Sequence, residues 1–207
     1  MSRMKPEGCA RDEDDGPTDS GNWDAGYALD KHTLSSTYIG DNEHGHAQFD
    51  TVRTEVGEAL YQLKYKKDFG QVDSLAEAIE EHLIPKFEQI GLVIPMPATN
   101  HRARQPVNEV AKALAKRLKV NSFENIRVKT PGSAGQPSLK NLAGKEAKAE
   151  AMKGRFAIDD VIQGDGCWNA LIVDDLFDTG ASMEAACATL RTYNKIGKIF
   201  VAALTWK

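Results

Sequence analysis

The sequence predicts an α/β fold in which a mostly parallel central sheet is flanked by helices. Three observations lead to this prediction. From about residue 92 onward, short apolar runs alternate with amphipathic segments, as in chains that build a parallel sheet from strand-helix-strand units. The run Ala170 to Val173 is apolar without helical spacing, which is typical of a strand buried on both faces. The 207 residues have an ordinary soluble composition and are enough for one sizeable domain, with or without a small appendage.

Composition and charge exclude several classes of protein. No apolar stretch is long enough to span a bilayer, and the first residues lack the apolar core of a secretion signal, so we expect a cytoplasmic protein without membrane contact. Cys9, Cys167 and Cys187 are odd in number and have no CxxC spacing, which argues against a disulfide framework or a zinc ribbon. The formal net charge of -4 argues against binding nucleic acid over the whole surface.

The N-terminal part divides into a tail and a small ordered region. Residues 1–24 are rich in Asp, Gly, Pro and Ser, so we expect a flexible tail. Residues 25–90 follow as an N-terminal helical region. Within it, Tyr27 to Phe49 predicts two short strands joined by a turn, and the spacing of apolar residues predicts helices over 51–67 and 72–87.

Residues 91–207 carry the alternating pattern and are predicted to form the core. The expected elements are strands at Leu92–Pro95, Ile126–Lys129, Phe156–Ile158, Ala170–Val173 and Lys198–Thr205, and helices at Pro106–Leu118 and Met183–Tyr193. The segment 130–155 contains several glycines, prolines and lysines without a sustained apolar pattern. A loop of this length in a compact domain predicts a flexible lid over a site.

The run LIVDDLFDTGASM, residues 171–183, is the most informative stretch. Asp174 and Asp175 follow the predicted buried strand, and the small residues 178–182 open a helix. Unpaired N–H groups and the positive end of the helix dipole favour an anion at such a turn, while adjacent carboxylates accept hydrogen bonds from vicinal hydroxyls. The pattern indicates a ribose whose phosphate points at the turn. The simpler alternative is a helix start with Asp178 or Thr179 as N-cap.

A second indication of an anionic ligand is the charge of residues 100–155, which hold thirteen Lys and Arg against four Glu. This basic stretch brackets the segment Ala98–Arg104 and the lid, so a polyanion is a competitive interpretation beside a solvated face. Nucleic acid is possible but not favoured, because aromatic residues that would stack on bases are missing. His44 and His46 could bind zinc, but without a third ligand chance spacing is the better interpretation.

The strand, Asp-Asp pair and Asp-Thr-Gly-Ala-Ser turn resemble the signature of the type I phosphoribosyltransferases. Further segments resemble the subfamily of the competence protein ComF, and they are Leu63-Lys64-Tyr65, Pro95-Met96-Pro97, Asn108-Glu109, Gln136, Leu139 and Lys153-Gly154-Arg155-Phe156. The sequence departs from that subfamily in two places. It lacks an N-terminal four-cysteine zinc module, and Gln105-Pro106 replaces an Arg-Gly pair.

The resemblance implies a type I phosphoribosyltransferase-like fold with residues 25–90 as a hood-like region. It implies a pentosyltransferase that moves the phosphoribosyl group of phosphoribosyl pyrophosphate to a nitrogen acceptor such as a nucleobase, with Mg²⁺ and with a homodimer as a possible assembly. The expected catalytic residues are Asp178, Asp174 and Asp175. The residues expected to bind the ribose and its 5'-phosphate are Asp174, Asp175, Asp178, Thr179, Gly180, Ala181 and Ser182. Those expected to bind pyrophosphate are Ala98, Thr99, Asn100, Arg102 and Arg104, and Asp174 and Asp175 would meet the metal through water.

Two other functions compete with this expectation. The chain could be a non-catalytic accessory or regulatory protein that binds phosphoribosyl pyrophosphate or a nucleotide in DNA uptake, DNA processing or defence. Nucleotide hydrolysis or phosphoryl transfer is less well supported, because no glycine loop is followed by a Walker lysine. The acceptor base does not follow from the sequence.

Overall fold

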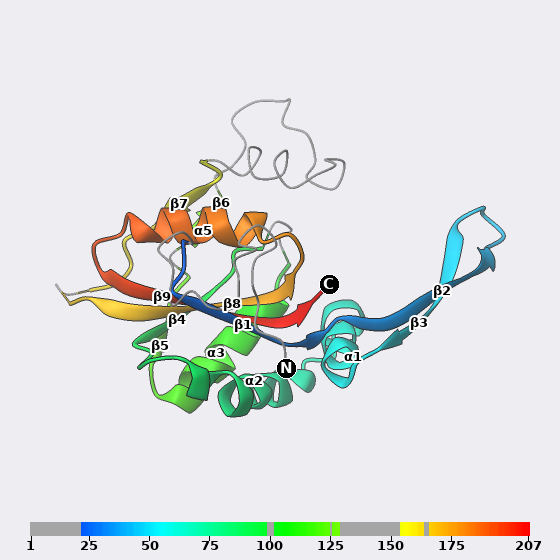
Figure 1. Ribbon diagram of the computed structural model, residues 1–207, viewed down its shortest axis with the longest axis horizontal. Coiled ribbons are helices and arrows are strands. Elements are labelled where there is room, and N and C mark those ends of the chain that lie inside the picture. Colours follow the sequence, from blue (N-terminus) through cyan, green and yellow to red (C-terminus); the bar gives the residue numbers. More distant parts are fainter. Residues whose placement is uncertain (1–21, 99–101, 125, 129–153, 164–165) are drawn as a thin grey trace, which may run out of the picture.

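The computed structural model describes residues 22–98, 102–124, 126–128, 154–163 and 166–207 (Figure 1). Five strands form the central sheet in the order β1-β9-β8-β4-β5, and every neighbouring pair is parallel. Their bounds are Ala25–Lys31 for β1, Leu92–Pro95 for β4, Asn121–Ser122 for β5, Trp168–Phe177 for β8 and Ile196–Trp206 for β9. This arrangement confirms the predicted α/β class with a mostly parallel sheet.

Helices cover both faces of this sheet, as a parallel sheet requires. Helix α5 (Ala181–Arg191) lies on one face, and α2 (Gln71–His82) and α3 (Pro106–Leu118) lie on the other (Figure 1). The side chains of β8 alternate between the two layers. Ile172 packs in the cluster that holds α5, whereas Leu171 packs in the cluster that holds α2 and α3. A strand buried on both sides explains why its sequence is an unbroken apolar run.

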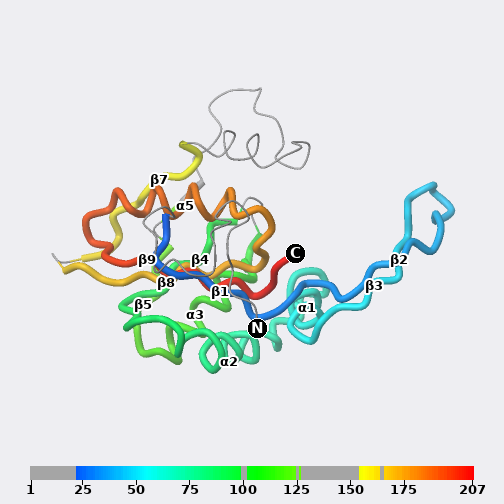
Figure 2. Tube along the Cα trace, in the orientation of Figure 1, coloured from blue at the N-terminus to red at the C-terminus, as the bar shows by residue number. Residues whose placement is uncertain are grey.

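The segment before the first long helix contains three strands rather than the two predicted. β1 joins the central sheet beside β9, because Ala25–Lys31 is apolar enough to occupy a half-buried edge. β2 (Thr33–Asp41) and β3 (Ala47–Arg53) form a separate antiparallel hairpin that projects away from the body of the molecule (Figures 1 and 2). The helix predicted over 51–67 therefore begins only at Glu55, where α1 (Glu55–Tyr61) starts.

The remaining elements are short. A π-helical turn, η1 (Gln62–Lys66), follows α1 directly, and a 3-10 turn, η2 (Ile84–Lys86), follows α2. β6 (Ile126–Val128) and β7 (Phe156–Ile158) pair antiparallel beside α5. In the described part of the chain no helix is long and apolar enough to cross a membrane. Nearly all of the predicted tail 1–24 and lid 130–155 lies outside the described residues.

β8 is longer than its apolar run predicts. It continues through Asp174 and Asp175 to Phe177, because β9 stays paired with it as far as Trp206. The two carboxylates thus lie inside the strand and not after its end. The following helix begins at Ala181, two residues earlier than predicted.

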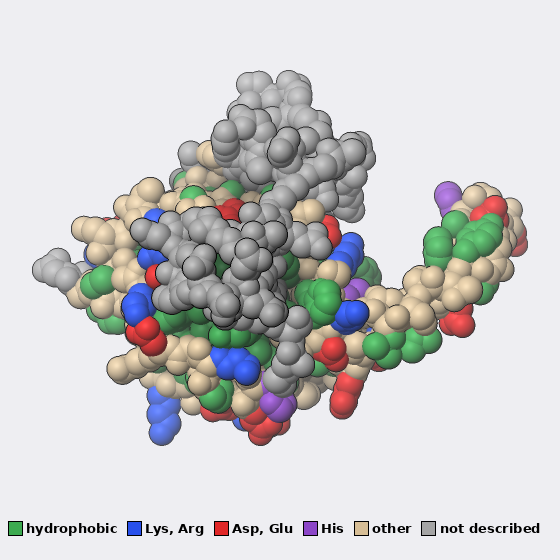
Figure 3. Space-filling view, in the orientation of Figure 1, with side chains coloured by type: hydrophobic (Ala, Val, Ile, Leu, Met, Phe, Trp, Pro, Cys, Tyr) green, Lys and Arg blue, Asp and Glu red, His purple; other side chains and the backbone are tan. Residues whose placement is uncertain are grey.

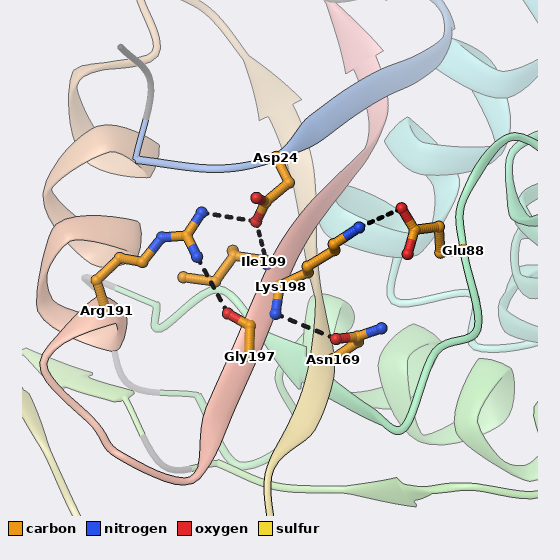
Figure 4. Close-up of polar contacts among 7 residues, drawn as sticks. All are labelled: Asp24, Glu88, Asn169, Arg191, Gly197, Lys198 and Ile199. Carbon is orange, nitrogen blue, oxygen red and sulfur yellow. Dashed lines mark hydrogen bonds and ion pairs between the residues drawn. The ribbon is translucent and has the colours of Figure 1, made fainter. Parts of the chain in front are cut away.

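Polar contacts at the opposite end of α5 fix the helix against the sheet (Figure 4). Arg191 donates to Asp24 Oδ2 at 2.6 Å and to the carbonyl of Gly197 at 3.0 Å. The same Asp24 oxygen accepts the backbone N–H of Ile199 at 2.7 Å. The carboxylate of Asp24, the residue just before β1, therefore joins this end of the strand to the last turn of α5 and to the start of β9.

Thr54 joins the hairpin to α1 and generates a stability prediction. Its buried hydroxyl donates to the carbonyl of Lys31 at 2.6 Å and accepts the N–H of Gly57 at 3.0 Å. Thr54→Val keeps the shape but removes both hydrogen bonds, so we expect a loss of about 1 to 3 kcal/mol in the free energy of unfolding. Denaturant unfolding measures this, and Thr54→Ser, which keeps the hydroxyl, should recover most of the loss. Equal stability of the Val variant and the wild type would contradict the assignment.

Candidate functional site

The connections of β4 and β8 diverge at the carboxyl edge of the sheet. β4 leads through α3 to β5 on one side, whereas β8 leads through α5 to β9 on the other. Between two such strands the following loops separate and leave a crevice, which is where open parallel sheets bind ligands. The two strands are held in register here, since the N–H of Met96 donates to the carbonyl of Val173 at 2.8 Å. The loop after β4 therefore begins beside Asp174.

Asp174 and Asp175 lie at this edge on β8. The N–H of Asp175 donates to Asp174 Oδ1 at 2.8 Å, which fixes one carboxylate against the backbone of the other. Burial is the main reason that the pKa of Asp174 rises to about 8, and the negative charge of Asp175 raises it further. Lys64 acts in the opposite direction. Near neutral pH the carboxyl of Asp174, which is partly exposed at the edge of the sheet, is thus mostly protonated.

Lys64 is a site residue that sequence reasoning missed. Its Nζ lies 2.8 Å from Asp175 Oδ2, and only 23% and 21% of the two side chains are exposed. The lysine is presented by the π-helical turn η1, which is followed by Lys67 in a left-handed conformation with φ of 59°. Single π turns are rare in proteins as a whole, but those that occur are frequently found at functional sites. The resemblance at Leu63-Lys64-Tyr65 marked this lysine, but the contact depends on tertiary packing that no local pattern reveals.

Asp175 is also held through its backbone. Thr205 Oγ1 on β9 donates to the carbonyl of Asp175 at 2.9 Å, and His32 Nδ1 lies 3.2 Å from the same hydroxyl. Burial lowers the pKa of His32, and the positive charges of Lys64 and Arg53 lower it further. A neutral imidazole beside Thr205 is the result, and it too was not anticipated from the sequence.

The turn predicted to bind phosphate links β8 to α5. Gly180 is the N-cap of α5 with φ +76°, and the cap position makes no side-chain hydrogen bond. The alternative of Asp178 or Thr179 as N-cap is therefore wrong. Glycine is required for a second reason, because a Cβ at this position would lie 2.8 Å from the ring of Phe177.

Because the N-cap residue is a glycine, it offers no side chain to the first-turn N–H groups of α5, which include those of Ala181 and Ser182. Such an end attracts an anion through its unpaired donors and the helix dipole. The acidic residue of this first turn, Glu184, is engaged elsewhere, since it accepts a hydrogen bond from Asn22 at 2.7 Å. The turn is chemically suited to a phosphate.

The residues predicted to bind pyrophosphate are only partly brought to this site. Ala98 is exposed in the loop after β4, and Thr99 and Asn100 lie outside the described residues. Arg102 donates to the carbonyl of Lys64 at 2.9 Å. Since the ammonium group of Lys64 contacts Asp175, Arg102 is linked to the carboxylate pair through this lysine. Arg104 instead pairs with Glu109 at 2.5 Å and stacks 3.8 Å from the ring centroid of Phe69. Arg104 is thus engaged by α3 and by the turn that precedes α2.

A resident metal cage is not formed by the described residues, among which no group of three or more His, Cys, Asp or Glu side chains could hold an ion. Two carboxylates at a sheet edge suit a metal that takes most of its ligands from water and from a bound phosphate. His44 and His46 lie in the exposed hairpin turn, where their backbone N–H groups donate to Asn42 Oδ1 at 2.9 Å. Asn42 shapes this turn, and no metal site is indicated there in the described chain.

Comparison with known proteins gives similarity only at the level of structure. No family model matches the sequence, and no curated protein matches it either. The chain is similar to an adenine phosphoribosyltransferase, with 18% identity over 83% of this chain and 86% of the other and a TM-score of 0.43. It is similar to the Saccharomyces cerevisiae adenine phosphoribosyltransferase, with 18% identity, coverage of 83% and 85%, and a TM-score of 0.42. It is also similar to a Staphylococcus aureus hypoxanthine phosphoribosyltransferase, with 14% identity, coverage of 66% and 63%, and a TM-score of 0.40. Similarity at this level carries no functional conclusion.

The protonation of Asp174 generates a prediction about pH. Its folded-state pKa of about 8 lies above the ordinary value of 3.8, so the folded chain binds this proton more tightly than the unfolded chain does. The contribution of the protonated Asp174 to the free energy of unfolding is fully present below about pH 4 and is lost as the pH rises towards 8. Asp174→Asn removes the titration, so the variant should gain stability relative to the wild type between pH 5 and 8, on the order of a few kcal/mol. Denaturant unfolding at a series of pH values measures this, and parallel pH profiles would contradict it.

Proposed function

We propose that this chain is a phosphoribosyltransferase that binds phosphoribosyl pyrophosphate and transfers its phosphoribosyl group to a nitrogen acceptor such as a nucleobase. The observation that carries the proposal is the carboxylate pair on β8 followed, after one short turn, by the N-terminus of α5 with Gly180 as its N-cap. Carboxylates accept hydrogen bonds from vicinal hydroxyls and helix termini bind phosphate, so the two features together fit a ribose 5'-phosphate. Their position between the diverging loops of β4 and β8 supports the same ligand.

Each part of the site has a task in this proposal. Asp174 and Asp175 accept the hydroxyls of the ribose, and residues 178–182 hold the 5'-phosphate through backbone N–H groups and the hydroxyls of Thr179 and Ser182. The diphosphate lies toward the loop after β4, where Arg102 donates to the carbonyl of Lys64, the residue whose ammonium group contacts Asp175. Hydroxyls that donate to Asp174 favour its ionised form, so binding near neutral pH releases a proton.

In the transfer step, the bond between C1 of the ribose and the pyrophosphate oxygen breaks and a bond from C1 to the acceptor nitrogen forms. Positive charge develops on the ribose, as in glycoside cleavage, and the carboxylates beside the ring stabilise it. Asp178 follows β8 directly and is the residue we assign to orienting the acceptor or taking its proton. A bound Mg²⁺ would neutralise charge on the leaving pyrophosphate, held by substrate oxygens and water near Asp174 and Asp175.

The second candidate is a protein that binds the same ligand without turnover and reports its level. The feature that favours this function is Arg104. It pairs with Glu109 and stacks on Phe69, whereas an enzyme would need this arginine to contact pyrophosphate. Gln105-Pro106 in place of Arg-Gly leaves one cation fewer in the same loop. Binding without pyrophosphate release across a panel of nucleobases would identify this function.

Calorimetry with phosphoribosyl pyrophosphate and Mg²⁺ tests ligand binding directly. We expect saturable binding in the wild type and a loss of about 2 to 5 kcal/mol in binding free energy when Asp174 and Asp175 are both changed to Ala, because charged hydrogen-bonding partners are removed. The control is Asp73→Ala with Glu81→Ala on α2, which removes two carboxyl groups from exposed positions. Equal affinity of the site variant and the control would contradict the assignment. A pyrophosphate-release assay then separates enzyme from sensor.

Lys64 provides an independent test through the pH dependence of binding. Its charge lowers the pKa of Asp174, so Lys64→Met should raise that pKa and move the midpoint of ligand affinity to higher pH. We also expect a roughly tenfold weaker affinity at neutral pH, since the partner of a partly buried charge is lost. Lys64→Arg should restore part of both effects. Lys66→Met, an exposed change in the same turn, is the control, and an unmoved midpoint in the Lys64 variant would exclude the role.

A further inference from the structure

His32 is the single residue between β1, which belongs to the central sheet, and β2, which begins the hairpin. The hairpin stands clear of the body of the molecule, so its base is where it joins the sheet (Figure 3). The N–H of His32 donates to the carbonyl of Trp206 at 2.9 Å, which continues the parallel pairing of β1 with β9. His32 thus lies at the carboxyl edge of the sheet, with β9 between it and the carboxylate pair on β8.

Helix α1 restrains the backbone of His32 from a second direction. The buried hydroxyl of Thr54, the N-cap of α1, donates to the carbonyl of Lys31 at 2.6 Å. Gly57, in the first turn of α1, leaves no room for a side chain between itself and the carbonyl oxygen of His32. Because contacts from both β9 and α1 hold this part of the chain, the imidazole of His32 extends from a fixed backbone.

The hydrogen bonds of Thr205 determine which nitrogen of His32 carries a proton. Thr205 is fully buried, and its hydroxyl has a single proton to donate. The carbonyl of Asp175, 2.9 Å away, can only accept, so the hydroxyl donates to it. His32 Nδ1, at 3.2 Å, must then donate to the hydroxyl oxygen. Two hydrogen bonds of the same direction therefore run from the ring of His32 to the backbone of Asp175.

The same helical segment also holds the side chain of Asp175. α1 leads directly into η1, which places Lys64 Nζ 2.8 Å from the carboxylate of Asp175. The start of this segment thus restrains His32, and its end pairs with the carboxylate. Asp175 is fixed in its backbone through the imidazole and in its side chain through the ammonium group. Such support from surrounding residues is what a precisely placed binding group requires.

We propose that His32 is a positioning residue that orients Asp175 through Thr205 and so gives the site its selectivity for a ligand with vicinal hydroxyls. The inference rests on the proposed function, in which the carboxylate pair accepts the hydroxyls of a ribose. A displaced carboxylate loses the distances and angles of these hydrogen bonds, whereas residues 178–182 hold the phosphate through their own backbone. His32 therefore affects recognition of the sugar and leaves recognition of the phosphate unchanged.

NMR of the ligand-free protein, isotope-labelled at nitrogen, tests the direction of the hydrogen bonds. At neutral pH we expect the ring of His32 to carry a proton on Nδ1. Thr205→Val keeps the shape of the side chain but removes the acceptor, so this fixed protonation should be lost. A ring without a proton on Nδ1 in the wild type overturns the inference, because Thr205 would then donate to His32 and not to Asp175. This measurement is independent of the proposed function.

Titrations with ribose 5-phosphate and with inorganic phosphate test the role in recognition. His32→Leu removes the donor and should weaken the affinity for ribose 5-phosphate roughly tenfold, with the affinity for inorganic phosphate unchanged. His32→Asn, whose amide can place a donor near the position of Nδ1, should recover most of the loss. His82→Leu, at an exposed position of α2, is the matched control and should change neither affinity. Equal losses for both ligands in His32→Leu would indicate a general loss of structure and overturn the role.

A double-mutant cycle tests whether His32 acts through Thr205. Thr205→Val should weaken the affinity for ribose 5-phosphate about as much as His32→Leu, and the two changes together should cost no more than either alone. Additive losses overturn the route through Thr205. A wild type that binds ribose 5-phosphate no more tightly than inorganic phosphate overturns the proposed function and this inference with it. A gain from the sugar that His32→Leu leaves intact overturns the inference alone.

Discussion

The burial of Ala170–Val173, the middle of β8, on both faces of the sheet is the constraint on which the rest of the molecule depends. A parallel strand without charged or polar residues from Ala170 to Val173 must be covered on both faces, and α5 and the α2–α3 layer provide this cover. Because the two flanking connections leave β8 and β4 in opposite directions, the sheet must open between them at its carboxyl edge. The divergence of the two connections at this edge is thus a consequence of how the hydrophobic strand is buried. The polar residues placed at this edge are what the proposed function depends on.

Burying a carboxylate on this strand costs free energy, and this cost explains the raised pKa of Asp174 and the pairing of Asp175 with Lys64. Asp174 continues a buried strand and is kept mostly neutral by that burial, whereas Asp175 has the ammonium group of Lys64 beside it. The lysine is supplied by the segment between the hairpin and α2, which sequence reasoning set apart from residues 91–207. Its π turn, with the carbonyl of Lys64 held by Arg102, joins that segment to the loop after β4. The N-terminal region therefore contributes directly to the electrostatics of the site.

Sequence patterns predicted the elements whose periodicity is local and missed the contacts that depend on tertiary pairing. β4, α3 and β7 have the bounds expected, because four apolar residues, a proline-led amphipathic stretch and a short apolar run each define one element. The extension of β8 through its two aspartates was missed, since only pairing with β9 makes polar residues continue a strand. The Lys64 contact joins residues 111 positions apart in the chain, and no periodicity indicates such a pair.

The protonation of Asp174 removes a conflict between the carboxylate pair and the phosphorylated sugar that we propose as the ligand. Two ionised carboxylates would repel a phosphorylated ligand, yet two carboxylates are what the hydroxyls of a ribose require. With Asp174 protonated and Asp175 paired with Lys64, the free site presents little net negative charge to an approaching anion. When vicinal hydroxyls donate to the pair, they replace the water lost on burial and stabilise the ionised form of Asp174. Under the proposed function, recognition of the sugar and loss of the proton are therefore one event, and a ligand with phosphates but without both hydroxyls would not release the same proton from the site.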